Sequence, residues 1–213
     1  TVEMLYKEGL INNYADLYTL TKDQLMPLER MAEKSAENLI NGVAASVTIP
    51  FERVLFGLGI RYVGETVAKK LAKAYKNIDA LMAATADDLV MVDEIGERIA
   101  ESTVNFFSDE KNRDIINRLK EYGLQFSLTE EQLDAQTEKL KGQSFVVSGV
   151  FEKVSRTELK KHIEDNGGKV SSSISSKTSY VVAGANMGPS KKIKAENFGI
   201  PIISEDDFLA MLK

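Results

Sequence analysis

The chain has 213 residues, 43% of them hydrophobic, which is enough to form the core of one or two domains. It contains no cysteine and one histidine, so a disulfide framework and cysteine-ligated zinc are excluded and a histidine-based metal site is not expected. No apolar run has membrane-spanning length and no secretory signal is visible, so we expect a cytoplasmic protein that does not bind membranes.

The net charge of −5 is distributed unevenly along the chain. Residues 1–128 hold 15 basic and 20 acidic side chains, residues 129–138 hold four acidic and no basic ones, and residues 139–213 hold 12 basic and 8 acidic ones. An acidic first part followed by a basic last part favours two modules with distinct functions, although the charge alone identifies no partner.

Residues 1–126 predict an all-α domain of short helices. Apolar residues recur there at intervals of three and four, as along residues 67–75, and no segment alternates like a strand. Pro50 fits the first turn of a helix, and Thr85 with Asp88 has the spacing of a capping box. We therefore expect helices of two to four turns, joined by tight turns.

Beyond this domain, residues 127–138 lose the helical periodicity and predict an acidic, solvated linker with room for one helical turn. The next segments read, in chain order, as strand 144–148, helix 155–165, strand 169–172, strand 180–183, helix 189–198, strand 201–203 and a helix capped by Ser204. This order predicts a small three-layer α/β domain with a parallel sheet over residues 139–213.

Two segments of the helical part share a pattern. Residues 58–71 and 91–100 each have an apolar helix end, a tight turn with an apolar residue before glycine (Gly64 and Gly96), and a second helix. Glycine allows close approach of a ligand, and the first N–H groups of the second helix form an anion site that suits a phosphate. Such contacts do not depend on base sequence, so an acidic domain can make them. The alternative is an ordinary helix bundle, with the residue before each glycine in the core.

The candidate DNA-backbone contacts are the residues of these two turns and the cations close to them. They are Gly59, Arg61, Val63, Gly64, Glu65, Thr66, Lys69, Lys70, Ile95, Gly96, Glu97 and Arg98. For each cation a merely solvated charge is the competing interpretation. The acidic pair at residues 93–94 has no third ligand at useful spacing, so we expect no metal site, and no residue is assigned a catalytic role.

Residues 58–64 (Leu-Gly-Ile-Arg-Tyr-Val-Gly) resemble a helix-hairpin-helix motif of the bacterial NAD-dependent DNA ligases, and the resemblance continues at residues 105–107 and 112–113. Residues 8–18 and 28–36 resemble two further hairpins of that family less closely. Ala32 stands where the family usually has glycine, which favours a packing role for that hairpin.

Residues 139–213 resemble a BRCT domain. The resemblance rests on residues 145–149, 167–168, 178–182 and 191–203, with Phe208 where BRCT domains often have tryptophan. It implies a phosphate pocket formed by Ser148, the N–H of Gly149, Arg156 and Lys191. The phosphate would belong to a DNA end or to a phosphorylated protein, and the basic balance favours DNA. Alternatively, Ser148 caps local groups and the cations are solvated.

The family resemblance implies non-sequence-specific binding of duplex DNA around nicks by the C-terminal region of a ligase that seals 5′-phosphate/3′-hydroxyl nicks in replication and repair. The family's Lys-x-Asp-Gly motif and four-cysteine zinc module do not occur here, so we expect this region to lack catalysis and NAD binding. NAD, Mg and Zn are implied for the parent enzyme, whose upstream catalytic domains would be partners. The alternative is a repair scaffold whose BRCT domain binds a phosphorylated protein. A self-contained nuclease or lyase would need a catalytic lysine or carboxylate cluster that these residues do not supply.

Overall fold

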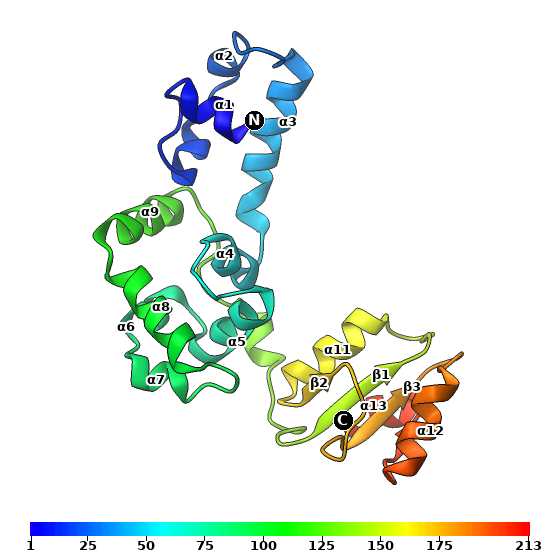
Figure 1. Cartoon of the computed structure of the whole chain (residues 1–213). Coiled ribbons are helices and arrows are strands. Elements are labelled where there is room, and N and C mark those ends of the chain that lie inside the picture. Colours follow the sequence, from blue (N-terminus) through cyan, green and yellow to red (C-terminus); the bar gives the residue numbers. More distant parts are fainter. The chain divides into compact units, whose positions relative to one another are not determined.

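The computed structural model describes residues 1–213 and divides into two compact units, Thr1–Leu128 and Thr129–Lys213 (Figure 1). The segment expected as a linker lies largely in the second unit, where residues Glu130–Asp134 form the short helix α10. Thr137 then donates from its N–H to the carbonyl of Asp165 at 2.7 Å. No helix has both the length and the apolar character needed to cross a membrane.

The first unit is entirely helical, as the sequence predicts. Its elements are α1 (Val2–Lys7), η1 (Tyr14–Thr19), α2 (Lys22–Leu25), α3 (Glu33–Ala45), η2 (Ser46–Thr48), α4 (Phe51–Gly57), α5 (Glu65–Tyr75), α6 (Ile78–Ala83), α7 (Ala86–Val90), α8 (Glu97–Ser108) and α9 (Glu110–Glu121), where η denotes a 3₁₀ helix. The capping box expected at Thr85 is present. Pro50 is the residue before α4 rather than part of its first turn.

Two apolar cores hold these helices together. Helices α1 to α3 enclose Leu5, Leu25 and Ala36, whereas α4 to α9 enclose a larger core that includes Phe51 and Leu71. All five side chains have no exposed surface, which is where burial contributes most to folding, at roughly 1.5–3 kcal/mol for a large side chain.

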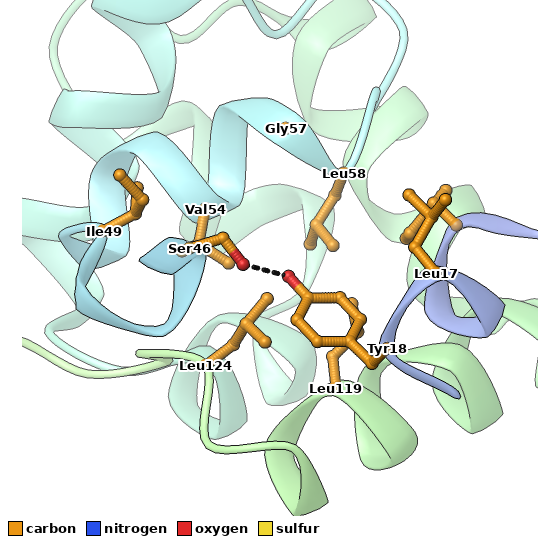
Figure 2. Close-up of a pocket in the computed structure, with 10 residues that line it drawn as sticks. Leu17, Tyr18, Ser46, Ile49, Val54, Gly57, Leu58, Leu119 and Leu124 are labelled. Atoms are coloured by element: carbon orange, nitrogen blue, oxygen red, sulfur yellow. Dashed lines mark hydrogen bonds between the residues drawn. The ribbon is translucent and has the colours of Figure 1, made fainter. Parts of the chain in front are cut away.

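Residues of η1 attach the first group of helices to the second. The ring of Tyr18 stacks on that of Tyr122 with centroids 5.3 Å apart, and Arg118 of α9 forms a 2.7 Å ion pair with Asp16. A cavity of about 220 Å³ lies beside these contacts (Figure 2). The hydroxyls of Tyr18 and Ser46 share a 2.5 Å hydrogen bond at its wall, which is otherwise mostly apolar.

Acidification is expected to weaken this attachment. Burial alone would raise the pKa of Asp16, but hydrogen bonds from the N–H groups of Asn12 and Asn13 and from Arg118 outweigh it and hold the pKa below its ordinary value of 3.8. A pKa lowered by folding stabilises the fold fully above the ordinary value, and the stabilisation is lost as the pH falls through the folded-state pKa.

A carboxyl-carbon NMR titration checks this prediction. We expect the midpoint for Asp16 to lie below 3.8 and to rise when Arg118→Met removes the ion pair. The same midpoint with and without Arg118 would contradict the account.

The second unit is a parallel α/β fold, and its fold class is confirmed. Its elements after α10 are β1 (Ser144–Ser148), α11 (Arg156–Asp165), β2 (Lys169–Ser171), β3 (Tyr180–Ala183), α12 (Pro189–Asn197), β4 (Ile202–Ile203) and α13 (Glu205–Met211). The strands pair in the order β2-β1-β3-β4, all parallel.

Side-chain alternation along the strands creates the three layers. Phe145 and Val147 of β1 belong to a core that includes Leu159 of α11 and Phe208 of α13, while Val146 belongs to a second core with Ala195 of α12. Phe208 has no exposed surface and meets Phe145 edge to face at 5.7 Å. It therefore provides the large apolar anchor expected in the last helix.

Candidate nucleic-acid interface

Three turns of the first unit have the same backbone conformation and recur at equal intervals, at residues 28–32, 60–64 and 92–96. In each turn the N–H of the fourth residue donates to the carbonyl of the first, at 3.1, 3.0 and 3.0 Å in chain order. The third residue has a positive φ in each case: 61° at Arg30, 67° at Tyr62 and 65° at Glu94. The three turns are thus copies of one hairpin.

The fifth residue of each turn is the N-cap of a helix. Ala32, Gly64 and Gly96 precede α3, α5 and α8 with extended backbones, and no side chain caps any of these helices. The first N–H groups of such a helix have no partner within the helix, and the helix dipole adds positive potential there. Each hairpin therefore presents donors suited to an anion.

Gly64 and Gly96 are not required by the fold. Their φ angles of −81° and −85° suit any residue, and a Cβ built at either position meets no atom within 4 Å. Ala32 shows directly that the same turn accommodates a Cβ. Neither strain nor packing calls for glycine, so two physical reasons remain: glycine is preferred over alanine at an N-cap, and it allows close approach of an external group. Gly59 differs, since its φ of 74° lies in the left-handed region, where the backbone itself favours glycine.

The hairpins 60–64 and 92–96 contact one another reciprocally. Lys70 of α5 forms a 2.6 Å ion pair with Glu94 in the second turn, and Ser102 of α8 donates a 2.7 Å hydrogen bond to the carbonyl of Arg61 in the first. Lys70 and Ser102 hold the same place relative to their glycines. These contacts link the two helix N-termini to each other.

A basic cluster, formed by Arg61 and Arg98, lies at turn 60–64. The guanidinium carbons of Arg61 and Arg98 lie 4.9 and 5.2 Å from the centre of the Tyr62 ring, which is 44% exposed. Both distances fit cation–π contacts. Two arginines from different hairpins are thus held together at the surface, where a phosphate chain could meet them.

The remaining candidate residues fall into two groups. Glu65, Thr66 and Glu97 are exposed in the first turns of α5 and α8. Lys69 is exposed one turn further along α5, with its ammonium 3.9 Å from the carboxylate of Glu65. Val63 and Ile95 are 5% and 4% exposed and belong to the large core, so only their backbones are available to a ligand. Lys70 differs from the other cations because it forms an ion pair with Glu94 of turn 92–96. Sequence reasoning missed Tyr62 and Ser102, and the equal spacing of the hairpins, which aligns Ser102 with Lys70, was a signal for Ser102 alone.

In the second unit, three of the four phosphate-pocket candidates meet at the end of β1. Ser148 is its last residue and is 4% exposed, Gly149 follows with φ 99°, and Arg156 donates a 2.7 Å hydrogen bond to the carbonyl of Val147. Lys191 lies in the first turn of α12, and no hydrogen bond or ion pair joins it to Ser148. Gly149 is required by the fold, because a Cβ there would lie 2.7 Å from the carbonyl oxygens of residues 184 and 185.

Residues 53–116 match the family model of the helix-hairpin-helix motif, and residues 135–212 match that of the BRCA1 C Terminus (BRCT) domain. The chain therefore combines a helix-hairpin-helix region with a BRCT domain. It is 67% identical over 213 residues to a DNA ligase of Christiangramia forsetii, 63% over 212 residues to one of Flavobacterium johnsoniae and 49% over 214 residues to one of Porphyromonas gingivalis.

Each of these alignments covers the whole chain but 32% of the relative. The chain thus spans about a third of the length of the curated DNA ligases it matches. The matches confirm both the two domain types and the resemblance to DNA ligases that residues 58–64 and 145–149 indicate.

Proposed function

We propose that this chain is the C-terminal region of an NAD-dependent DNA ligase and grips the sugar-phosphate backbone of duplex DNA around a nick. The observation that carries the proposal is the pair of uncapped helix N-termini at Gly64 and Gly96, each open to close approach although the fold tolerates a side chain there. Two linked sites suit the regular phosphates of a duplex, and contacts through peptide groups make the binding independent of base sequence.

The chemical step, on this proposal, belongs to the rest of the parent protein. No group of three or more metal-ligating side chains gathers in this chain, so no step through a metal is assigned to its residues. NAD, Mg and Zn would act in the parent's catalytic domains, where they would support the sealing of nicks in replication and repair. This region contributes by holding the DNA in place while those domains close on it.

A fluorescence anisotropy titration tests the proposal directly. Labelled nicked and intact duplexes of two unrelated base sequences are titrated with the chain at two salt concentrations. We expect similar affinities for the two sequences and a steep loss of affinity with salt. No binding at low salt, or strong preference for one sequence, would contradict the proposal.

The basic cluster should contribute to this salt dependence. Arg98→Met is expected to lower the slope of log affinity against log salt by about 0.9, the effect of one lost phosphate contact. Arg30→Met is the matched control, because Arg30 lies in the turn that precedes Ala32 and is exposed. An equal change of slope in both variants would show that general charge, rather than this hairpin, is responsible.

We propose a second phosphate site at the end of β1. The observation that favours it is the hydrogen bond from Arg156 to the carbonyl of Val147, which places a guanidinium at the end of the strand, where the nearly buried Ser148 follows. A 5′-phosphorylated DNA end and a phosphoserine peptide are compared as ligands, with Arg156→Met as the variant. Binding of the DNA end fits the ligase proposal, whereas binding of the peptide alone favours the repair scaffold.

A further inference from the structure

Hairpin 92–96 carries negative side chains in its turn, whereas hairpin 60–64 does not. Asp93 and Glu94 occupy the places in turn 92–96 that Arg61 and Tyr62 occupy in turn 60–64. Two carboxylates that lie two and three residues before Gly96 would repel a phosphate at the N-terminus of α8 unless a cation offsets them. The anion site at Gly96 therefore depends on charge supplied from elsewhere in the unit.

Lys70 supplies that charge from the other hairpin. Its ammonium lies 2.6 Å from a carboxylate oxygen of Glu94 and 3.7 Å from one of Asp93, and its side chain is 26% exposed. The reciprocal contact, from Ser102 to the carbonyl of Arg61, is uncharged. The difference between the two contacts matches the charges of the turns, since turn 60–64, which Ser102 contacts, already holds the cation Arg61.

We infer that Lys70 is a positioning residue for DNA binding: it offsets part of the negative charge of turn 92–96 and holds this turn against α5, so that the N–H groups at Gly96 can bind a phosphate. Lys70 does not itself contact the phosphate. The inference rests on the proposed function and adds to it a reason why a domain with an acidic hairpin binds DNA.

A set of charge variants tests this role. Lys70→Met should weaken binding of a nicked duplex by roughly five- to tenfold, since the ion pairs of Lys70 with Asp93 and Glu94 are lost and the turn becomes more negative by one charge. The salt slope should stay that of the unaltered chain, because no phosphate contact is lost. Lys70→Arg should keep the affinity. Adding Asp93→Asn and Glu94→Gln to Lys70→Met should restore it to within about twofold.

Lys22→Met is the matched control. Lys22 also pairs with two carboxylates, Glu33 and Glu37, both at 2.7 Å, but it lies beside the hairpin that has Ala32. We expect this variant to bind DNA like the unaltered chain. A loss equal to that of Lys70→Met would overturn the inference.

Three further results would overturn it: a salt slope lower by about 0.9 in Lys70→Met, an unchanged affinity in that variant, or no recovery in the triple variant. The backbone amide signal of Gly96 gives a readout without DNA, and it should shift in Lys70→Met and return in Lys70→Arg. The double variant Gly64→Ala, Gly96→Ala, measured in the same assay, distinguishes a failure of the proposed function from a failure of the inference about Lys70. If that pair leaves binding intact, the proposed function fails and the inference with it. If that pair weakens binding while the Lys70 results disagree, the inference alone fails.

Discussion

Replacing Gly64 and Gly96 together by alanine should weaken binding of a nicked duplex by at least about 100-fold, because each hydrogen-bonded phosphate contact is worth roughly 1.5–3 kcal/mol and each 1.4 kcal/mol is tenfold. Each added methyl group projects into the open space where the phosphate would come. The fold should be retained at a cost of roughly 0.5–1 kcal/mol per N-cap, since both φ angles suit alanine and no atom lies within 4 Å of the new Cβ. Anisotropy measures the affinity, and circular dichroism with thermal unfolding checks the fold.

The chain contains the matched control for this experiment. Ala32 occupies the equivalent place in hairpin 28–32, and Ala32→Gly should leave DNA affinity unchanged if, as we propose, the other two hairpins make the contacts. Single variants should each show part of the loss. A double variant that binds as tightly as the unaltered chain would contradict backbone recognition at these turns.

Gly149→Ala is expected to have its largest effect on stability rather than on binding. Gly149 has a φ of 99°, and a Cβ there would lie 2.7 Å from the carbonyl oxygens of Gly184 and Ala185. A strained backbone and a clash with fixed main-chain atoms should together lower the free energy of unfolding of the second unit by about 2–4 kcal/mol. Urea denaturation followed by NMR signals of the second unit measures this change.

Gly188→Ala provides the comparison for that prediction. Gly188 precedes α12 in the same unit, has a φ of −60°, and leaves a Cβ no neighbour within 4 Å. We expect this variant to unfold within about 0.5 kcal/mol of the unaltered chain. If Gly149→Ala proved equally stable, the packing argument would be wrong, and a role in ligand binding would become the better reason for glycine at residue 149.

Local signals in the sequence predict much of the fold. The capping boxes at Thr85 and Ser155 mark helix starts, and both are present. The strand and helix order of the second unit follows from alternation and turn residues and matches the structure within one or two residues at most ends. The local sequence of residues 129–138 could not reveal that they pack with the second unit. Their hydrogen bonds reach residues such as Asp165, which lie far along the chain.

The candidate site was predictable in part. The two glycine turns stand out in the sequence, but Lys69 and Lys70 are indistinguishable there as neighbouring cations on one helix. The packing of α5 against turn 92–96 separates them, because it pairs Lys70 with Glu94 and leaves Lys69 exposed. Contacts between two hairpins are tertiary facts, and helical periodicity carries no information about them. Similarly, Arg156 meets the end of β1 as expected, whereas no hydrogen bond joins Lys191 to Ser148.

The most direct test of the central claim is to titrate an unlabelled nicked duplex into ¹⁵N-labelled chain and follow the backbone amide signals. We predict that the largest shifts occur at Gly64, Gly96 and the first residues of α5 and α8, and that Ala32, in the same turn conformation, stays unchanged. Shifts confined to the second unit, or no shifts at low salt, would contradict DNA recognition by the hairpin backbone.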